Sequence, residues 1–316
     1  MEHKPHAHHT IHAHHRHLGW NNTFQPAIRI ATGDTVAIET NESSDGQIDR
    51  NTKAEDLTKL DFGRANVLSG PIWVEGAEPG DALKVTVLNF TPTGQGYSAI
   101  IPGFGLLAED FTKPAIHWWT YDPSCKVPAA FGRHARVPLK PFAGTMGVAP
   151  AEAGQHSVIP PRRVGGNMDL RDIAAGTELY LPVEVQGALF SVGDTHAVQG
   201  DGEVCGTALE SRLDVALRFE VIKGRAPRFP RVTTHGPVAR HLDGKGYEIA
   251  TGVGPDLMEA AKNAVRGMID VLTAEHGLTP EDAYMLCSVC ADLRISEIVD
   301  RPNWIVSLYF PRIVFD

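Results

Sequence analysis

A tight turn that leads into an alternating strand fills residues 78–88, which read Glu78-Pro79-Gly80-Asp81-Ala82-Leu83-Lys84-Val85-Thr86-Val87-Leu88. From Leu83 onward, apolar and polar side chains alternate, as they do in a strand that buries one face. The turn Thr32-Gly33-Asp34 leads in the same way into the run Val36-Ala37-Ile38-Glu39-Thr40. Turns that each open a short alternating strand are typical of a β-sandwich, so the pattern predicts one for this part of the chain.

The rest of the chain divides into a glycine-rich part and a helical part. In the first we predict strands at 179–183, 189–192 and 213–219. In the second the apolar spacing is helical up to Gly277, a residue well suited to end a helix. Thr279-Pro280-Glu281-Asp282 then has the form of a capping box that opens a second helix.

These patterns predict a mainly β protein. Its body is a jelly-roll-like β-sandwich at 17–140, followed by a further β-rich, glycine-rich segment at 141–225 that carries the candidate active site. A smaller α/β portion with two helices occupies 226–316 and closes with a strand at 304–310. Residues 1–16 precede the body as a histidine-rich tail, which we expect to be partly mobile and able to bind metal adventitiously.

Composition argues against several functional classes. The formal net charge of the 316 residues is −9, and the arginine clusters at 162–163 and 225–231 are too small to form a nucleic-acid-binding surface. No run approaches the roughly 18 apolar residues of a transmembrane helix, and histidines interrupt the stretch where a secretory signal would lie. Four cysteines do not make a disulfide framework in a chain of this length, so we expect a cytoplasmic protein without membrane or nucleic-acid partners.

The segment 193–210 carries the strongest chemical signal. Asp194 and His196 lie two residues apart, so both side chains project from one face if strand geometry continues. The turn at Gly200-Asp201-Gly202 would bring Glu203 back beside them, with Glu210 one strand-length later. An imidazole beside carboxylates favours a divalent metal such as zinc, and a carboxylate off the metal can act as a general base. A polar hairpin tip, with Asp and Gly present only for the turn, is the alternative.

Further metal ligands come from other parts of the chain. Asp45, in an Asp-Gly turn after the strand at 36–40, could add a carboxylate, and His17 could add a second imidazole. The alternatives are an ordinary turn residue and one more member of the histidine-rich tail. His156 is undecided in the same way.

The four cysteines offer a second kind of chemistry. Cys287 and Cys290 form a Cys-x-x-Cys pair inside a predicted helix, and with no second pair to complete a zinc site they are expected to be buried packing residues. Cys205 lies two residues after Glu203 and is a candidate nucleophile that His196 would activate. The acids around Cys205 would raise the pKa of its thiol, which disfavours that reading. No Gly-x-Ser-x-Gly elbow occurs to support a serine hydrolase of that design.

Several long motifs carry a family resemblance. The central one is Gly193-Asp194-Thr195-His196-Ala197-Val198-Gln199-Gly200-Asp201-Gly202-Glu203-Val204-Cys205-Gly206-Thr207-Ala208-Leu209-Glu210, and others lie at 70–81, 141–150, 160–169 and 282–288. Together they resemble the acetamidase/formamidase family, from about His17 to the C-terminus. The resemblance implies a β-sandwich-like body with an α/β portion, homo-oligomeric assembly, a metal-dependent mechanism, and hydrolysis of formamide, acetamide or close relatives. The family pattern often has Asp where this chain has Asn21, which puts a catalytic role at that position in doubt.

Our hypothesis is a metal-dependent amidase. Asp194 and His196, joined by Asp45 and His17, hold a divalent ion, with zinc preferred and calcium or another divalent ion as alternatives. Glu203 acts as general base toward water activated by the ion and passes the proton to the leaving nitrogen.

Other readings and details stay open at this point. Phe104, Trp73 or Phe142 is expected to line a compact pocket for the small amide. The alternatives to the metal mechanism are a hydrolase that uses Cys205 as nucleophile and a non-catalytic β-sandwich that binds a small molecule or a metal.

Overall fold

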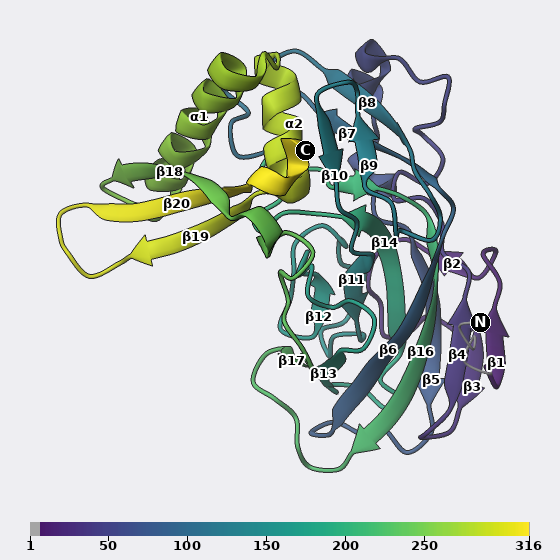
Figure 1. Cartoon of the computed structure of the whole chain (residues 1–316). Coiled ribbons are helices and arrows are strands. Elements are labelled where there is room, and N and C mark those ends of the chain that lie inside the picture. Colours follow the sequence, from purple (N-terminus) through teal and green to yellow (C-terminus); the bar gives the residue numbers. More distant parts are fainter. Residues whose placement is uncertain (1–6, 316) are drawn as a thin grey trace.

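The computed structural model describes residues 7–315 and confirms a mainly β protein with a small C-terminal α/β portion (Figure 1). Two large sheets make the body, and the α/β portion, with its long hairpin, projects from one end of it. Among the described residues, neither α-helix has the length and hydropathy that a membrane span requires.

The first sheet has six strands. Its long central strands are β6 (Ala82–Pro92) and β16 (Leu213–Ile222), which are antiparallel neighbours. In β6, Leu83, Val85 and Val87 are fully buried while the residues between them are partly exposed, as the alternation of the sequence predicts. The order is β1 (His9–Ile11), β4 (Thr35–Ile38), β16, β6, β13 (Glu178–Pro182), β17 (Arg231–Thr233).

The second sheet has nine strands and is centred on β14 (Phe190–Val198). Every residue of β14 is buried, because the strand is covered on both faces. The main path runs β12 (Gly165–Asn167), β11 (Phe142–Gly147), β14, β15 (Leu209–Glu210), β7 (Gln95–Ile100), β8 (Ala115–Thr120). Strand β5 (Leu68–Val74) also pairs with β14 and with β2 (Arg16–His17) and β3 (Ile28–Ile30).

The two sheets enclose a shared apolar core, which makes the body a sandwich. Phe190 of the second sheet and Phe219 of the first meet edge to face, with ring centroids 5.0 Å apart. Both rings are fully buried, and burial of each such side chain contributes roughly 1.5–3 kcal/mol to stability. This core therefore fixes the position of β14, the central strand of the second sheet.

The strands of the segments 17–140 and 141–225 are interleaved in both sheets. In the first sheet β16 lies between β4 and β6, and in the second β14 lies beside β5. The two segments therefore do not form separate units, because each needs strands of the other to complete its sheets. Turns and alternation mark individual strands, but they do not say which distant strand each one pairs with.

The described part of the histidine-rich N-terminus belongs to the body. Strand β1 pairs in parallel with β4, and the imidazoles of His8 and His9 each contact the Asp34 carboxylate at 3.1 Å. Residues 1–6, which fall within the expected tail, lie outside the described residues.

The C-terminal portion joins two helices to a three-stranded sheet. Helix α1 (Leu257–His276) begins at the Asp256 cap and ends at Gly277, which has the left-handed φ of 66° that favours glycine. Helix α2 (Pro280–Cys290) begins as predicted at Thr279, whose hydroxyl accepts a hydrogen bond from the Asp282 N–H. The strands lie in the order β18 (Tyr247–Gly254), β20 (Trp304–Pro311), β19 (Asp292–Glu297).

This portion packs against the strands at the centre of the body. Its apolar side chains share one cluster with Ala197 and Val198 of β14 and Leu209 of β15. Cys287 and Cys290 are buried in α2 as free cysteines within the same cluster, as expected. Shorter elements complete the chain: strands β9 (Ala129–Phe131) and β10 (Ala135–Val137), and 3₁₀ turns at Ala54–Lys59, Phe62–Arg64, Asp243–Lys245 and Arg312–Phe315.

Candidate active site

Strand β14 carries two ionisable residues into the interior of the protein. Asp194 is 4% exposed and His196 is fully buried, and Asp194 Oδ1 lies 3.3 Å from His196 Nε2. The neighbouring strand β15 places Glu210 directly opposite His196 in the register. Glu210 Oε1 lies 3.3 Å from the same Nε2 atom. Two carboxylates therefore converge on one imidazole nitrogen.

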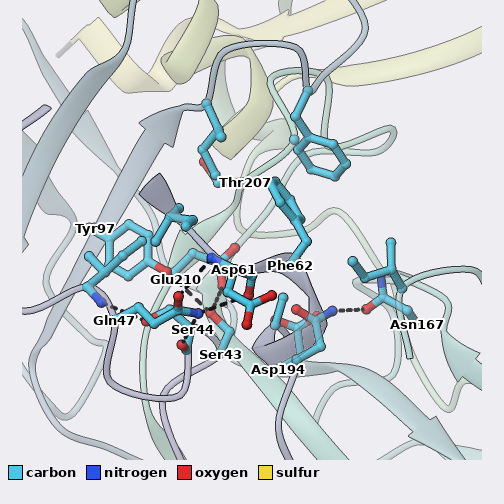
Figure 2. A pocket seen from close by; sticks show the side chains of 18 of the residues that line it. Ser43, Ser44, Gln47, Asp61, Phe62, Tyr97, Asn167, Asp194, Thr207 and Glu210 are labelled. Carbon is cyan, nitrogen blue, oxygen red and sulfur yellow. Dashed lines mark hydrogen bonds between the residues drawn. The ribbon is translucent and has the colours of Figure 1, made fainter. Parts of the chain in front are cut away.

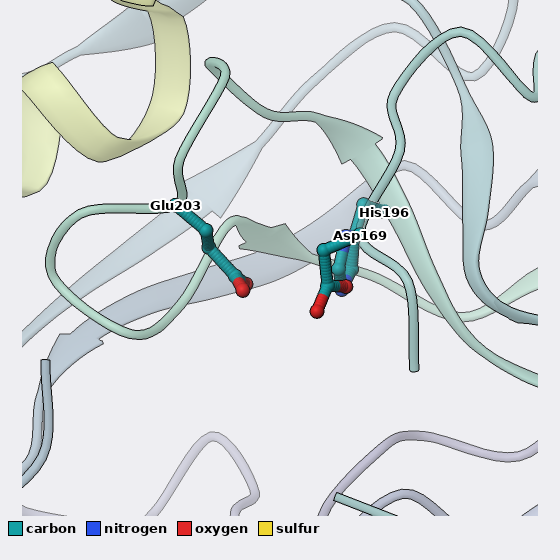
Figure 3. Close-up of side chains that lie close together, drawn as sticks. All are labelled: Asp169, His196 and Glu203. Carbon is teal, nitrogen blue, oxygen red and sulfur yellow. The ribbon is translucent and has the colours of Figure 1, made fainter. Parts of the chain in front are cut away.

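Two loops bring further carboxylates to this point. Asp169 follows β12, and Glu203 follows the turn at 200–202; their carboxylates lie near the imidazole of His196 (Figure 3). The ligand atoms of Asp169, His196 and Glu203 lie within 4.8 Å of one another, as do those of Asp194, His196 and Glu210. We call these five residues the acid–histidine cluster.

Three of the four acids sit on strained backbone. Asp169, Asp194 and Glu203 have φ angles of 46°, 51° and 43°, in the left-handed region that L-residues other than glycine rarely adopt. Each such residue costs on the order of 1–3 kcal/mol and persists only where its surroundings hold it, which is common at functional sites.

The four carboxylates differ in how the protein satisfies them. Asp194 Oδ2 accepts a hydrogen bond from Asn66 Nδ2 at 3.0 Å. Glu210 accepts hydrogen bonds from the Ser43 hydroxyl and the Ala208 N–H, both at 2.9 Å. By contrast, Asp169 Oδ1 is buried without a partner among the described residues.

Glu203 is the other acid whose carboxylate has no protein donor among the described residues. Within residues 7–315 no side-chain hydrogen bond or ion pair of its carboxylate occurs. Among the described residues, Asp169 and Glu203 are thus the cluster members whose carboxylates accept no hydrogen bond from the protein.

The tautomer of His196 is fixed by Gln199. The Gln199 amide nitrogen donates to the backbone carbonyl of Asp169 at 2.9 Å, so its amide oxygen must face His196 Nδ1, 3.0 Å away. His196 Nδ1 therefore carries a hydrogen and donates it to Gln199. The remaining nitrogen, Nε2, is the atom directed at the carboxylates, an arrangement that orients many metal-binding histidines.

Burial and mutual repulsion shift the pKa values of this cluster. Burial, followed by the charge of Asp194, raises the pKa of Asp169 to about 7. Burial also raises the pKa of Glu203 well above its usual range, with the charge of Asp169 adding to it. Burial acts to lower the pKa of His196, but the charges of Glu210 and Asp194 outweigh it and raise that pKa well above normal. The group therefore needs positive charge, either protons or a cation.

A cavity of about 90 Å³ opens beside the cluster (Figure 2). Asp194, Glu203 and Glu210 lie on its polar wall. Its apolar lining comes from Ile48, Leu60, Phe62, Ile101, Phe104 and Ile159. The rings of Phe62 and Phe104 pack together, with centroids 5.5 Å apart, and both are more than a third exposed. The arrangement suits a small molecule with one polar and one apolar end.

Comparison with known proteins places this chain in a family. The model of the Acetamidase/Formamidase family matches residues 2–157 and 151–316. The chain belongs to the acetamidase/formamidase family. An acetamidase of Mycolicibacterium smegmatis is 29% identical, over 85% of this chain and 84% of that protein.

Solved structures of acetamidase/formamidase relatives share the fold. An acetamidase from Bacillus halodurans is 31% identical and superposes with a TM-score of 0.67, over 95% of this chain and 96% of that chain. A gamma lactamase from Delftia acidovorans has a TM-score of 0.87 over 96% of this chain and 90% of that chain; at 24% identity, it supports the fold. The family resemblance of the motifs is confirmed, and the chain is an amidohydrolase.

Two of the expected metal ligands lie outside the acid–histidine cluster. Asp45 pairs with the guanidinium groups of Arg16 and Arg64, the latter at 2.8 Å. His17 contacts the Gly19 carbonyl through Nδ1 at 3.0 Å and the Ser191 hydroxyl through Nε2 at 2.9 Å. The structure therefore brings together only Asp194 and His196 of the four, because opposite charges and hydrogen-bond partners hold the other two elsewhere.

Other residues singled out in the sequence also lie apart from the cluster. The Asn21 side chain accepts hydrogen bonds from the N–H and hydroxyl of Thr23, both at 2.8 Å, and so caps a local turn. His156 Nε2 lies 3.2 Å from the Glu152 carbonyl. Of the three aromatic residues expected in the pocket, Phe104 lines the cavity.

The other two aromatic residues have different roles. Phe142 packs edge to face on the His196 ring, with centroids 5.0 Å apart, and so supports the imidazole. Trp73 lies beneath the Arg29 guanidinium at 4.2 Å.

The Cys205 thiol is directed into the protein interior. Its Sγ atom lies 3.5 Å from the Ala99 carbonyl and 3.6 Å from the Thr207 carbonyl. Burial raises the pKa of this thiol, so the reactive thiolate is disfavoured.

Sequence reasoning left three site residues unassigned. Asp169 ends the glycine-rich run 165–169, to which the sequence analysis assigned no chemical role. Asn167 of that run and Asn66 line the cavity. The Asp at the end of the run was a usable signal, but nothing in the sequence places it opposite β14, because that placement depends on the pairing of β12 with β11 and of β11 with β14.

A buried ion-pair group links both acid-bearing loops to the C-terminal portion. Arg171, two residues after Asp169, is 3% exposed and its Nη2 donates to Asp292 at 2.8 Å. Arg171 Nε also lies 3.2 Å from the Asp201 carboxylate, which is two residues before Glu203. Asp292 is fully buried at the start of β19. The C-terminal portion therefore helps to fix the positions of the two acids that lack protein partners.

Proposed function

We propose that this chain hydrolyses a small aliphatic amide, of formamide or acetamide type, to a carboxylate and ammonia with the help of a divalent ion, preferably zinc. One observation carries the proposal: four carboxylates converge on a single imidazole at the wall of a cavity of about 90 Å³. The names of related acetamidases and the family membership of the chain support the reaction class.

The cluster fits a divalent ion in three respects. It offers one nitrogen and several carboxylate oxygens, a donor set that zinc and similar first-row ions accept. Gln199 holds the proton of His196 on Nδ1, which leaves the lone pair of Nε2 for a ligand. Asp169 Oδ1 is buried without a partner, as expected of an atom that awaits a cation or a water.

His196, Asp194 and Glu210 would hold the ion, because Nε2 faces both of these carboxylates at 3.3 Å. A divalent ion at that place supplies positive charge that polarises an amide carbonyl and lowers the pKa of water. Asn66, Ser43 and the Ala208 N–H orient the two carboxylates through the hydrogen bonds described above.

Glu203 is the residue we assign to proton transfer. Its carboxylate has no protein donor among the described residues, borders the cavity, and lies within reach of Asp169 and His196. Glu203 accepts a proton from the attacking water and delivers it to the departing nitrogen, which leaves as ammonia. Burial, followed by the charge of Asp169, raises the pKa of Glu203, which suits a group that must both take and return a proton.

The cavity sets the size of the substrate. Its apolar lining, with Phe104 among it, suits a short acyl chain, and its polar wall faces the amide.

Ammonia release from formamide and acetamide tests the proposal. Wild-type protein is assayed before and after dialysis against a chelator, with metal content measured in both samples. We expect the metal-free protein to lose activity and to regain it with zinc. Full activity of protein shown to be metal-free would contradict the role of the ion.

A variant set tests the assignment of the proton carrier. Glu203→Gln keeps the shape of the side chain but cannot take a proton, so we expect kcat to fall by about 10²–10⁴-fold. Cys205→Ser tests the rival thiol mechanism and is expected to retain most activity, because the thiol is buried away from the cavity. Loss of turnover in Cys205→Ser with an active Glu203→Gln variant would favour the rival.

We also propose that the chain acts as a homo-oligomer. Apolar side chains of the projecting sheet support this, since Ile249 and Val253 on β18 and Ile295 on β19 are each about half exposed. Light scattering on the purified protein would test it, and a mass of 34.2 kDa, that of one chain, would contradict it.

A further inference from the structure

Asn167 presents a polar group to the cavity that the mechanism above does not use. The residue ends strand β12 and lines the cavity on the same side as Asp194 (Figure 2). Its amide oxygen accepts a hydrogen bond from Asn66 Nδ2 at 2.8 Å and one from the Thr145 hydroxyl at 2.6 Å. Both acceptor positions of that oxygen are therefore occupied by the protein.

The orientation of the Asn167 amide follows from its hydrogen-bond partners. The amide nitrogen of Asn66 donates to Asp194 Oδ2 at 3.0 Å. That nitrogen directs its other hydrogen to the Asn167 side chain, which must therefore offer its oxygen. The reversed orientation would set two amide nitrogens 2.8 Å apart with neither able to accept.

The Asn167 amide nitrogen is consequently left for the cavity. Within residues 7–315 it has no protein acceptor, while its oxygen has two protein donors. A side-chain N–H₂ that borders a cavity, with its orientation fixed by a chain of hydrogen bonds, is a donor prepared in advance for a ligand acceptor.

We infer that Asn167 is a catalytic residue whose amide N–H donates a hydrogen bond to the carbonyl oxygen of the bound amide. This assignment rests on the proposed function. As water attacks the carbonyl carbon, the C=O π electrons move onto the oxygen, which becomes an oxyanion and a stronger acceptor. The Asn167 N–H₂ transfers no proton; it stabilises that charge, and the charge returns when the C–N bond breaks and ammonia leaves.

The hydrogen bonds from Asn66 to Asp194 and Asn167 depend on a left-handed backbone at Asn66. Asn66 has a φ of 54°, a conformation that asparagine adopts more readily than most residues. Its backbone N–H donates to the Ser43 carbonyl at 2.7 Å. This anchor places the side chain between Asp194 and Asn167, so that one amide group connects the acid–histidine cluster to the donor.

The test compares an amide with its thioamide. Asn167→Ala and Asn167→Asp both remove the donor. Asn263→Asp makes the second change in helix α1, at a half-buried residue that does not line the cavity. Each variant is assayed on acetamide and thioacetamide, and its metal content and thermal unfolding are measured. Sulfur is a weak hydrogen-bond acceptor, so a donor aimed at the carbonyl oxygen matters less for the thioamide.

We expect Asn167→Ala to lower kcat on acetamide by about 10²–10³-fold with KM changed by less than about threefold. On thioacetamide the loss should shrink to less than about tenfold, and Asn263→Asp should behave as wild type on both substrates. Equal losses on the two substrates, or a change confined to KM, would overturn the donor role. Wild-type protein that releases no ammonia from either substrate would instead refute the proposed function, and this inference with it.

Discussion

A single methyl group at Gly144 should displace the acid–histidine cluster. Gly144 lies in β11, and a Cβ built on it would lie 2.5 Å from Asp169 Oδ1 and 2.9 Å from His196 Cε1. Ordinary contact begins near 3.4 Å, so in Gly144→Ala the Asp169 carboxylate must move by about 0.9 Å. The backbone φ of Gly144 is one that alanine can adopt, so the effect comes from the methyl group itself.

A shift of about 1 Å in catalytic geometry costs roughly 100-fold in rate. We therefore expect Gly144→Ala to lower kcat/KM for acetamide by about 100-fold, equivalent to about 2.7 kcal/mol of transition-state stabilisation. Gly236→Ala is the matched control, since a Cβ there has nothing within 4 Å, and it should stay within about twofold of wild type. Initial rates of ammonia release and thermal unfolding curves are measured for both variants. A folded Gly144→Ala protein with kcat/KM within about threefold of wild type would refute the reasoning.

Three further predictions concern the support of the site and the stability of the chain. Asp201→Asn removes one partner of Arg171 and should lower kcat by about tenfold, whereas Asp172→Asn, which breaks a half-buried ion pair with Lys140, should leave kcat unchanged. Burial lowers the pKa of His17 to about 4, so its stabilising effect is complete above pH 6.5 and is lost as the pH falls toward 4. The stability advantage of wild type over His17→Asn should therefore shrink by about 2–3 kcal/mol between pH 7.5 and pH 4.5 in urea unfolding. Gly267→Ala, inside α1 with room for a methyl group, should raise the free energy of unfolding by about 0.5–1 kcal/mol.

Each of these predictions has a clear contrary result. Equal kcat values for the Asp201 and Asp172 variants would show that the buried ion pairs do not position the acids. Parallel stability curves for wild type and the His17 variant across the same pH range would show that His17 is not held neutral. A less stable Gly267→Ala protein would mean that the added methyl group does not fit against Ala250, its nearest neighbour at 3.6 Å.

Local features of the fold could be predicted from the sequence. The alternation at 83–88 and the cap at Thr279 depend only on neighbouring residues, and both are present in the structure. The sequence marks where the second helix begins but not where it ends. The helix ends at Cys290, because Asp292 begins β19 and forms an ion pair with Arg171. That contact joins residues far apart in the chain, so helical spacing alone could not reveal it.

The candidate site also combines residues that local spacing brings together with residues that distant strand pairing brings in. Asp194, His196, Glu203 and Glu210 lie within one hairpin, so their proximity follows from strand period and turn length. Asp169 joins them through the pairing of three strands, which sequence spacing does not encode. Asp45 has the right side chain for a metal ligand, but it pairs with Arg16 and Arg64. No pattern of neighbouring residues predicts these two partners.

The interleaving of strands has a consequence for a chain still emerging from the ribosome. Ala37 of β4 pairs with Ala216 of β16. The first sheet therefore cannot form until residues near 220 have been synthesised, and the strands of the first half of the protein stay unpaired until then. Such distant pairings are slow to form and leave apolar strands exposed to other chains meanwhile. Enzyme that is cut short before β16 should therefore aggregate rather than persist as a smaller folded fragment.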